Sequence, residues 1–376
     1  MRTVRRLLYI EVLGAVAFVT VAFLALFYFL DLVDQLGDVG RGAYRVQHAA
    51  LYCLLELPSH FYELFPIAVL IGTTFALARL AQSSEFTILR TGGLGPGRAL
   101  GLLAMLGLAA AVLTFVVGDY VAPQAGAYGD AMKATLKYQQ TGQPSGRRAS
   151  AWLKDRRSAR PGETPAGERL DSIHVGHVGP DGRLEDVDIY EFGPDSQLLR
   201  RVRAARGVAG TDGWQLEDVR ITRWESDGDE HLSTDETRAA LAWPATLTRS
   251  VVAAAVAPLR SMSTLDLYRY SSHLSDNEQA VQRQQIQFWK KALYPLACLV
   301  MVGLALPFAY LHARGGGVSV KVFGGILLGI SFVLLNNVST HLGLLRDWTP
   351  WIAAAAPSAF YLLLSMAAFS WLVRYR

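Results

Sequence analysis

Six apolar segments, each long enough to cross a lipid bilayer, determine what this chain can fold into. A helix needs about 20 apolar residues to span the roughly 30 Å hydrocarbon core. The segments carry few charges and occupy residues 13–30, 51–78, 99–118, 292–313, 322–345 and 348–373. We therefore expect an α-helical membrane protein with six transmembrane helices, which excludes an ordinary soluble enzyme.

The region between the third and fourth apolar segments has a different repeat. Hydrophobic residues alternate with polar ones, as in half-buried strands, and turn signals such as Gly179-Pro180-Asp181-Gly182 separate the runs. The alternating pairs are Ile173 with Val175, Val187 with Ile189, Trp214 with Leu216, and Val219 with Ile221. Short strands without helical patterns between them predict an inserted all-β, jelly-roll-like domain.

These patterns divide the chain into three parts. Residues 1–118 hold the first three helices, residues 119–288 hold the β domain with a flanking helix, and residues 289–376 hold the last three helices. The net charge of +4 belongs to the helical parts, because residues 119–288 contain 21 basic and 24 acidic residues. The basic residues therefore flank membrane helices, and we expect no nucleic-acid partner.

The short loops between helices carry an uneven distribution of positive charge. One side of the membrane has ten basic residues, and the short loops of the other side have Arg41, Arg45 and Arg346. Cytoplasmic loops attract Lys and Arg, so we expect both termini in the cytoplasm and the β domain outside it. Lys290 and Lys291, at the outer start of the fourth helix, oppose this trend.

No catalytic or cofactor-binding motif is found. The sequence lacks a phosphate-binding Gly-x-x-x-x-Gly-Lys-[Ser/Thr] loop, and it contains no Gly-Lys dipeptide. His174 and His177 lie three residues apart in a predicted strand, so they point to opposite faces and do not form a metal site. We expect a protein that is not an enzyme and binds no metal or cofactor.

Polar residues inside the apolar segments are candidates for a cavity, because each is costly in lipid. Glu56, His60 and Glu63 recur at spacings of four and three, so they share one helix face. This face fits either a proton relay or an amphipathic segment that touches water or a neighbouring helix. Asn336 and Asn337 either bond helix to helix or line a path.

The cytoplasmic segment between the second and third helices is a candidate docking element. Phe86, Leu89 and Arg90 lie on one side of a possible short helix, which Thr91-Gly92-Gly93 ends. A short helix with exposed apolar residues fits a docking site for a partner. The alternative is a plain interfacial helix in the loop.

Five short motifs, in this order along the chain, resemble the lipopolysaccharide export permease family LptF/LptG (YjgP/YjgQ). They are Leu-Val-Asp-Gln-Leu at 32–36, Leu-Ala-Gln-Ser-Ser-Glu at 80–85, Val-Ala-Pro-Gln at 121–124, Trp-Leu-Lys-Asp at 152–155 and Phe-Trp-Lys-Lys-Ala-Leu-Tyr-Pro-Leu at 288–296. The resemblance spans nearly the whole chain. The first and fourth motifs favour the LptG-like branch over the LptF-like one.

The resemblance implies one half of a heterodimeric permease in the bacterial inner membrane, paired with an LptF-like chain. Two copies of a cytoplasmic LptB-like ATPase would use ATP and Mg, so this subunit would hydrolyse nothing. Lipopolysaccharide would enter sideways from the outer leaflet, with the first and fifth helices as lateral gates, and pass to a bridge of LptC- and LptA-like periplasmic β-jelly-roll proteins toward the outer membrane. The family's coupling helix corresponds to residues 84–91, with Glu85 engaging the ATPase.

The sequence departs from the family at the outer end of the first helix. Some relatives carry lysines there that face lipid A phosphates, whereas this chain has Asp31, Gly37 and Asp38. The nearby cations that can substitute are Arg41, Arg45, Lys290 and Lys291, for which membrane anchoring is the alternative role.

Two other functions fit the same pattern of helices. A proton-coupled lipid or solute transporter would use Glu56, His60 and Glu63. A membrane-anchored sensor or scaffold would bind a ligand in its β domain and signal through the helices.

Overall fold

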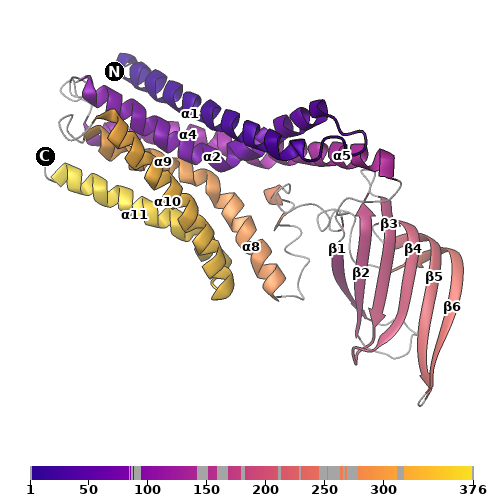
Figure 1. Cartoon of the computed structure of the whole chain (residues 1–376). Coiled ribbons are helices and arrows are strands. Elements are labelled where there is room, and N and C mark those ends of the chain that lie inside the picture. Colours follow the sequence, from indigo (N-terminus) through magenta and orange to yellow (C-terminus); the bar gives the residue numbers. More distant parts are fainter. Residues whose placement is uncertain are drawn as a thin grey trace. The chain divides into compact units, whose positions relative to one another are not determined.

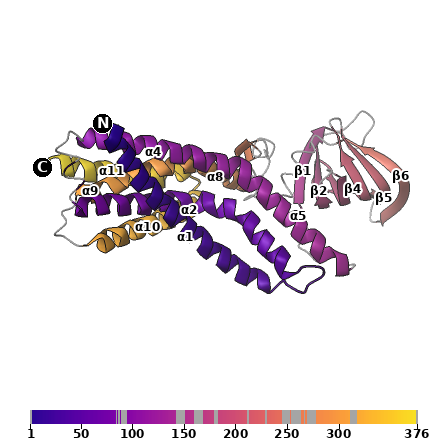
Figure 2. The same ribbon diagram turned by 90° about the horizontal axis from the view of Figure 1, so that it is seen from above.

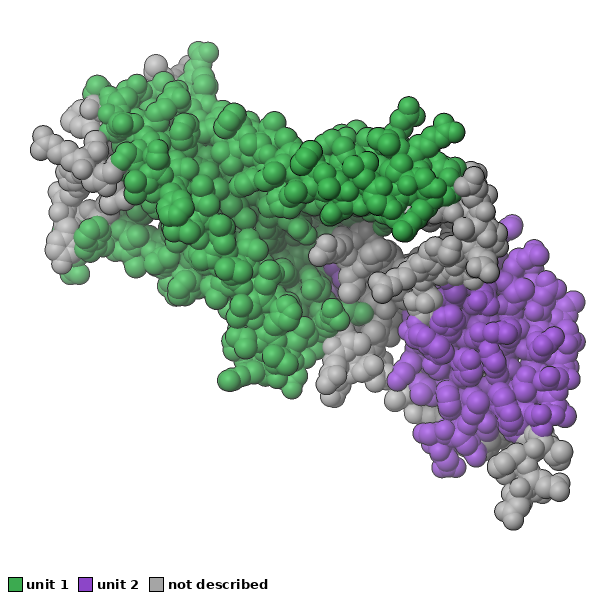
Figure 3. All heavy atoms as spheres, in the orientation of Figure 1, with its two compact units in different colours: residues 1–140, 282–376 green, residues 141–281 purple. Residues whose placement is uncertain are grey.

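The computed structural model describes residues 2–83, 85, 88, 95–141, 151–158, 168–178, 183–210, 213–227, 230–244, 252, 263–265, 267–268, 278–310 and 317–374. They form two compact units, shown in different colours in Figure 3. The first unit comprises residues 1–140 and 282–376 and contains the long helices. The second comprises residues 141–281 and contains the strands.

The first unit is a bundle of long helices (Figures 1 and 2). Six helices within the described residues are long and apolar enough to cross a membrane, which confirms the predicted number. Two of the six spans contain a break: the π-helix η1 (Val117–Val121) joins α4 to α5, and the 3-10 helix η3 (Tyr294–Leu296) joins α8 to α9. The helices are α1 (Arg2–Leu36), α2 (Val46–Gln82), α4 (Pro96–Val116), α5 (Ala122–Thr141), α8 (Glu278–Leu293), α9 (Ala297–Tyr310), α10 (Val318–Leu345) and α11 (Pro350–Arg374).

Helix α2 lies at the centre of the bundle. It packs against α1, α4, α9 and α10, and its second half, from Phe65 to Ala78, is almost continuously buried. Helix α1 packs mainly on α2, so much of its apolar surface is exposed, with Phe18 at 76%. Helix α10 likewise exposes an apolar face that includes Phe323 and Leu334. These faces are suited to lipid or to a partner helix.

Glycines in the helices allow the backbones to approach closely. A Cβ added to Gly72 of α2 would lie 2.6 Å from the Cα of Val16 in α1, and one added to Gly329 of α10 would lie 2.7 Å from Ile67. Helices in membranes associate through such small residues, because lipid gives no hydrophobic drive for their association. Gly72 and Gly329 therefore fix how close α1 and α10 lie to α2.

Tyr62 of α2 connects the two breaks in the transmembrane helices. Pro295 has no N–H to bond the carbonyl of Lys291 four residues earlier, and the hydroxyl of Tyr62 donates to that carbonyl at 3.1 Å. In return, the hydroxyl of Tyr294 donates to the carbonyl of Glu63 in α2. The ring of Tyr62 also packs on Gly118 in the π-helix. One side chain thus joins α2 to both irregular segments.

The second unit confirms the predicted all-β insert. Its six strands form one antiparallel sheet in which neighbours in the chain are neighbours in space. Buried hydrophobic residues from all six strands, including Ile173, Val187 and Trp214, form its core. The strands are β1 (Ala151–Ser158), β2 (Glu168–Val178), β3 (Arg183–Phe192), β4 (Leu198–Ala209), β5 (Trp214–Asp227) and β6 (Glu230–Trp243).

The sheet is strongly curled (Figure 2). Asp186 and Asp218 have positive φ angles of 54° and 53° and occupy equivalent places in the register of β3 and β5. Such irregular residues bend strands and exchange their faces. In the register, Arg200 of β4 pairs with Arg223 of β5, and Trp243 of β6 pairs with Trp214 of β5. These two β5 positions are nine residues apart, yet the Arg200 guanidinium lies 4.7 Å from the Trp243 ring centre. A flat sheet would separate them by about 30 Å.

Charged residues form a row across the inner face of this curled sheet. Asp155, Asp171 and Glu191 are register partners on β1, β2 and β3, and all three are buried. Glu191 accepts hydrogen bonds from both Arg169 and Arg200. The two guanidinium groups offset the cost of burying the Glu191 carboxylate, and removing one member leaves a buried charge uncompensated.

We expect Gly72→Ala to destabilise the helical unit by about 1–3 kcal/mol, because the added methyl group meets the α1 backbone. The measurement is thermal unfolding of the full chain in detergent. Gly14→Ala in α1 is the matched control, since its Cβ would meet no atom within 4 Å. Equal stability of the two variants would contradict the close contact of α1 with α2.

We expect Glu191→Ala to destabilise the β domain by about 3–5 kcal/mol, because Arg169 and Arg200 would lose their buried partner. Amide hydrogen exchange of β3 and β4 in the full chain measures this loss. The control is Glu185→Ala, an exposed residue of the same strand. Unchanged protection in Glu191→Ala would show that the ion pairs contribute nothing to the fold.

Candidate functional site

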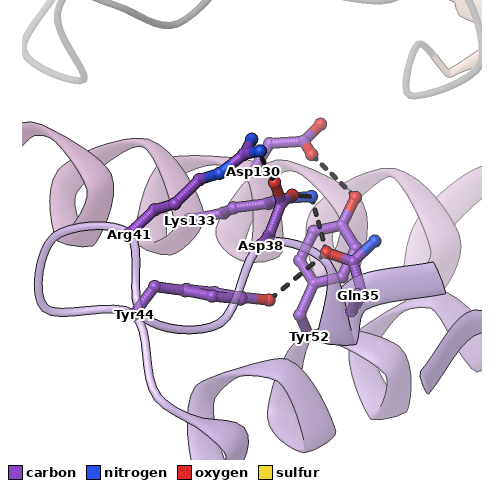
Figure 4. Close-up of polar contacts among 7 residues, drawn as sticks. All are labelled: Gln35, Asp38, Arg41, Tyr44, Tyr52, Asp130 and Lys133. Atoms are coloured by element: carbon purple, nitrogen blue, oxygen red, sulfur yellow. Dashed lines mark hydrogen bonds and ion pairs between the residues drawn. The ribbon is translucent and has the colours of Figure 1, made fainter. Parts of the chain in front are cut away.

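A polar cluster joins the C-terminal end of α1 and the N-terminal part of α2 to α5, the helix that precedes the β insert in the chain (Figure 4). The ammonium group of Lys133 lies 2.6 Å from the side-chain oxygen of Gln35 and 3.1 Å from the carboxylate of Asp38. Arg41 binds the other oxygen of Asp38, also at 3.1 Å. Asp38 therefore holds two cations, one from α5 and one from the turn after α1.

Two tyrosines complete the cluster. Burial raises the pKa of Tyr44 to about 12, so its hydroxyl stays protonated and donates to Gln35 at 3.4 Å. The hydroxyl of Tyr52 in α2 donates to Asp130 of α5 at 3.2 Å, and the Lys133 ammonium lies 4.8 Å from the centre of the Tyr52 ring. The side chains of α5 are thereby fixed against both α1 and α2.

The turn between α1 and α2 depends on two glycines. Gly40 and Gly42 have φ angles of 91° and 66°, which residues with a Cβ rarely adopt. The turn is closed by a hydrogen bond from the N–H of Gly40 to the carbonyl of Tyr44. This tight turn brings Arg41 and Tyr44 back toward the end of α1.

A second polar contact joins α1 and α2 within the same half of the helices. His60 Nε2 lies 2.6 Å from the carboxylate of Asp31, and Phe27 packs beside the imidazole with a ring-centre distance of 5.1 Å. The acidic residues that depart from the family pattern are thus paired within the chain. Asp31 binds His60, and Asp38 binds Lys133 and Arg41.

At the opposite end of α1, Glu11 binds Arg79 of α2 at 2.9 Å. Helix α1 is therefore joined to the bundle by charged contacts near both of its ends. The Glu11–Arg79 pair borders a shallow pocket between the two helices, lined also by Ile10, Phe18 and Phe75. This pocket opens beside apolar side chains of α1 that are exposed.

The three polar residues that we expected on one face of α2 have different surroundings. His60 contacts α1, Glu56 is half-buried, and Glu63 is exposed while its backbone carbonyl accepts from Tyr294. Asn336 is buried in α10, and Asn337 beside it is exposed. Hydrogen bonds from α10 to α11 come instead from two serines. The hydroxyl of Ser339 donates to the carbonyl of Ala353 at 2.7 Å, and the hydroxyl of Ser331 lies 2.5 Å from that of Tyr361.

The candidate cations occupy two different elements. Arg41 and Arg45 are exposed in the turn between α1 and α2, and the Arg41 side chain is 71% accessible. Lys290 and Lys291 are half-buried in the last turn of α8. The cluster in Figure 4 contains two cations. The Arg41 side chain is 71% accessible and the Lys133 side chain 21%, so Arg41 is the more exposed of the two.

The candidate coupling segment is described at two positions. Glu85 and Ile88 are helical and exposed, with Ile88 68% accessible. Phe86, Leu89 and Arg90 lie outside the described residues. A carboxylate and an apolar side chain three positions apart lie on the same side of a helix.

Besides Tyr44 and Tyr52, the sequence analysis missed two charged members of the cluster, Lys133 and Asp130. Both lie in α5, which continues beyond the third apolar segment. The available signal was their spacing of three residues, which puts them on one face of a helix if the helix continues past Gly118. That face meets the charged residues after α1 only once the helices are packed.

Comparison with known proteins identifies the family. The family model described as "Lipopolysaccharide export system permease LptF/LptG" matches residues 6–373. Lipopolysaccharide export system permease protein LptG of Haemophilus influenzae is 26% identical over 360 residues, which cover 94% of each chain. The protein of that name from Escherichia coli K12 is 27% identical over 341 residues, 90% of this chain and 89% of the relative. The family match covers the helices and the β insert alike, and the chain belongs to the lipopolysaccharide export system permease family LptF/LptG.

Proposed function

We propose that this chain is the LptG-type permease subunit of an ATP-driven lipopolysaccharide exporter in the bacterial inner membrane. The observation that carries the proposal is the family match across residues 6–373, which includes both the six membrane helices and the β insert. The ten basic residues in loops on one side support cytoplasmic termini and a periplasmic β domain.

An LptF-like chain is the proposed partner within the membrane. The outward faces of α1 and α10 are apolar and exposed, as Phe18 and Phe323 illustrate. Helix α1 packs mainly on α2, and its polar contacts with α5 are further contacts that a movement of α1 would break. The exposed apolar faces support α1 and α10, the first and fifth membrane helices, as the lateral gates through which lipopolysaccharide enters from the outer leaflet.

A cytoplasmic LptB-like ATPase dimer would supply the energy, and ATP and Mg would bind to it rather than to this chain. Glu85 would engage the ATPase, with Phe86, Leu89 and Arg90 as further contacts of the coupling helix. The exposed, helical Glu85 and Ile88 support this docking role, since their carboxylate and alkyl groups are available to a partner.

The polar cluster at the insert-side end of the helices is the proposed contact for anionic lipid. Arg41 and Arg45 are exposed there, and Lys290 and Lys291 flank the break between α8 and α9. A phosphate group would compete with Asp38 for Arg41 and Lys133, because both cations already bind that carboxylate. Binding would thereby loosen the link of α1 to α5. The lipid would then pass along the β domain to LptC- and LptA-like β-jelly-roll proteins.

The Asp31–His60 pair favours proton-coupled transport as a second candidate, with Glu56 and Glu63 on the same helix as His60. A proton-coupled protein would transport lipid in vesicles without any ATPase, and a Glu63→Gln variant would be inactive. The family match favours the ATP-driven function, since it covers the whole helical unit.

We expect Glu85→Lys to weaken association with the ATPase and to lower lipopolysaccharide extraction at least tenfold, because a carboxylate contact becomes a like-charge clash. Co-purification of the complex and extraction from proteoliposomes measure the two effects. Gln82→Lys, an exposed residue one turn earlier, is the control. Normal association and extraction by Glu85→Lys would contradict the coupling role.

We expect the double variant Arg41→Ala/Arg45→Ala to lower photocrosslinking of lipopolysaccharide to the helical unit about tenfold, the effect of losing a charged hydrogen bond. Arg346→Ala, an exposed cation of the loop between α10 and α11, provides the comparison. If all three changes had the same small effect, Arg41 and Arg45 would be membrane anchors rather than lipid contacts.

A further inference from the structure

The outer face of the β sheet carries three neighbouring aromatic rings that the proposed function does not use. Trp152 of β1 has its ring centre 4.9 Å from that of His174 in β2 and 5.9 Å from that of Tyr190 in β3. The adjacent residues in the strands, such as Leu153 and Ile173, are buried in the core, so the rings lie on the opposite face. The Trp152 side chain is 62% exposed.

Two arginines of β4 extend this aromatic group. The Arg201 guanidinium lies 5.3 Å from the centre of the Tyr190 ring and 2.9 Å from the carboxylate of Asp188. Arg203 binds the same carboxylate at 3.2 Å, and this bond raises the pKa of Arg203. Asp188 is buried, and its carboxylate fixes the positions of both guanidinium groups.

The charge of this group remains positive. One carboxylate balances one of the two guanidinium groups, and each guanidinium has five N–H donors, more than it uses on Asp188. The exposed Lys154 lies in the same row of the sheet as Tyr190 and Arg201, which adds a further positive charge. The surface thus combines exposed ring faces with fixed cationic donors.

These two features fit a phosphorylated sugar. The apolar C–H face of a pyranose ring packs on aromatic rings, whose faces carry partial negative charge. Phosphate groups bind arginine in a bidentate geometry. An acyl chain matches the rings and not the cations.

We propose that Trp152, His174, Tyr190, Arg201 and Arg203 form a subsite for the phosphorylated sugar portion of lipopolysaccharide. This inference rests on the proposed function, because it takes lipopolysaccharide as the cargo. It adds that the β domain contacts the polar part of the cargo on its outer face, separately from any contact that the helices make with lipid.

The test uses the purified complex with its partner chains in lipid nanodiscs. The probe is fully deacylated lipopolysaccharide, a soluble oligosaccharide that keeps its phosphates, and binding is measured by calorimetry and saturation-transfer NMR. We expect Trp152→Ala and Arg203→Gln each to weaken binding about tenfold. Phosphatase treatment of the probe should abolish the effect of Arg203→Gln and preserve that of Trp152→Ala.

Matched controls use other exposed residues of the same sheet. Trp224→Ala on β5 and Arg206→Gln on β4 remove a ring and a cation outside the proposed subsite, and we expect neither to change binding. Amide hydrogen exchange checks that the sheet is intact in each variant. Trp152 and Arg203 are both more than half exposed, so their replacement leaves the core in place.

Three results would overturn the inference. The first is absence of probe binding by a complex that extracts lipopolysaccharide from proteoliposomes, which leaves the proposed function standing. The second is equal weakening by the control variants. The third is normal probe binding by Trp152→Ala together with loss of a β-protein partner, which would make the surface a protein interface. Failure of the wild-type complex to extract lipopolysaccharide would instead contradict the proposed function.

Discussion

The packing of α2 against four other helices is the contact on which the membrane unit depends. Its buried second half is apolar, and apolar surface gives no hydrophobic drive for helix association in lipid, so close approach at Gly72 and Gly329 supplies the attraction. The same helix carries Tyr62, which satisfies the carbonyl that Pro295 leaves without a donor. Rigid contacts thus gather on α2, while α1 and α10 keep one face open. In the proposed function, this combination would let the gate helices move against a fixed centre.

Charged contacts as well as apolar packing hold α1 on this centre. Glu11–Arg79 lies near one end of the helix, and Asp31–His60 and Asp38–Lys133 lie toward the other. An ion pair weakens when another charged group competes for one of its two partners, whereas the packing of methyl groups has no such competitor. In the proposed function, a phosphorylated lipid beside α1 would therefore act directly on the contacts that hold the helix.

The six spans and the β insert could be predicted from the sequence, because a long apolar segment with few charges and a two-residue hydrophobic repeat are local signals. It was not sufficient for the cluster around Asp38, which forms only when α5 returns beside α1. Helix α5 has no apolar stripe of its own, so Lys133 and Asp130 carried no signal as a site. The face shared by Glu56, His60 and Glu63 was correct helical geometry, yet tertiary packing gives each residue different surroundings. The order and alternation of the strands also do not reveal the curl that brings the side chains of Arg200 and Trp243 into contact.

The two faces of the β sheet differ in their side chains. The curl at Asp186 and Asp218 closes apolar side chains inside, and the alternation of strands then forces every second residue outward. Trp152, Tyr190 and the arginines paired with Asp188 occupy those outward positions. Because acyl chains and phosphorylated sugars are joined in one molecule, a domain that handles both must offer both environments at once. A curled sheet with alternating side chains provides them within a single layer.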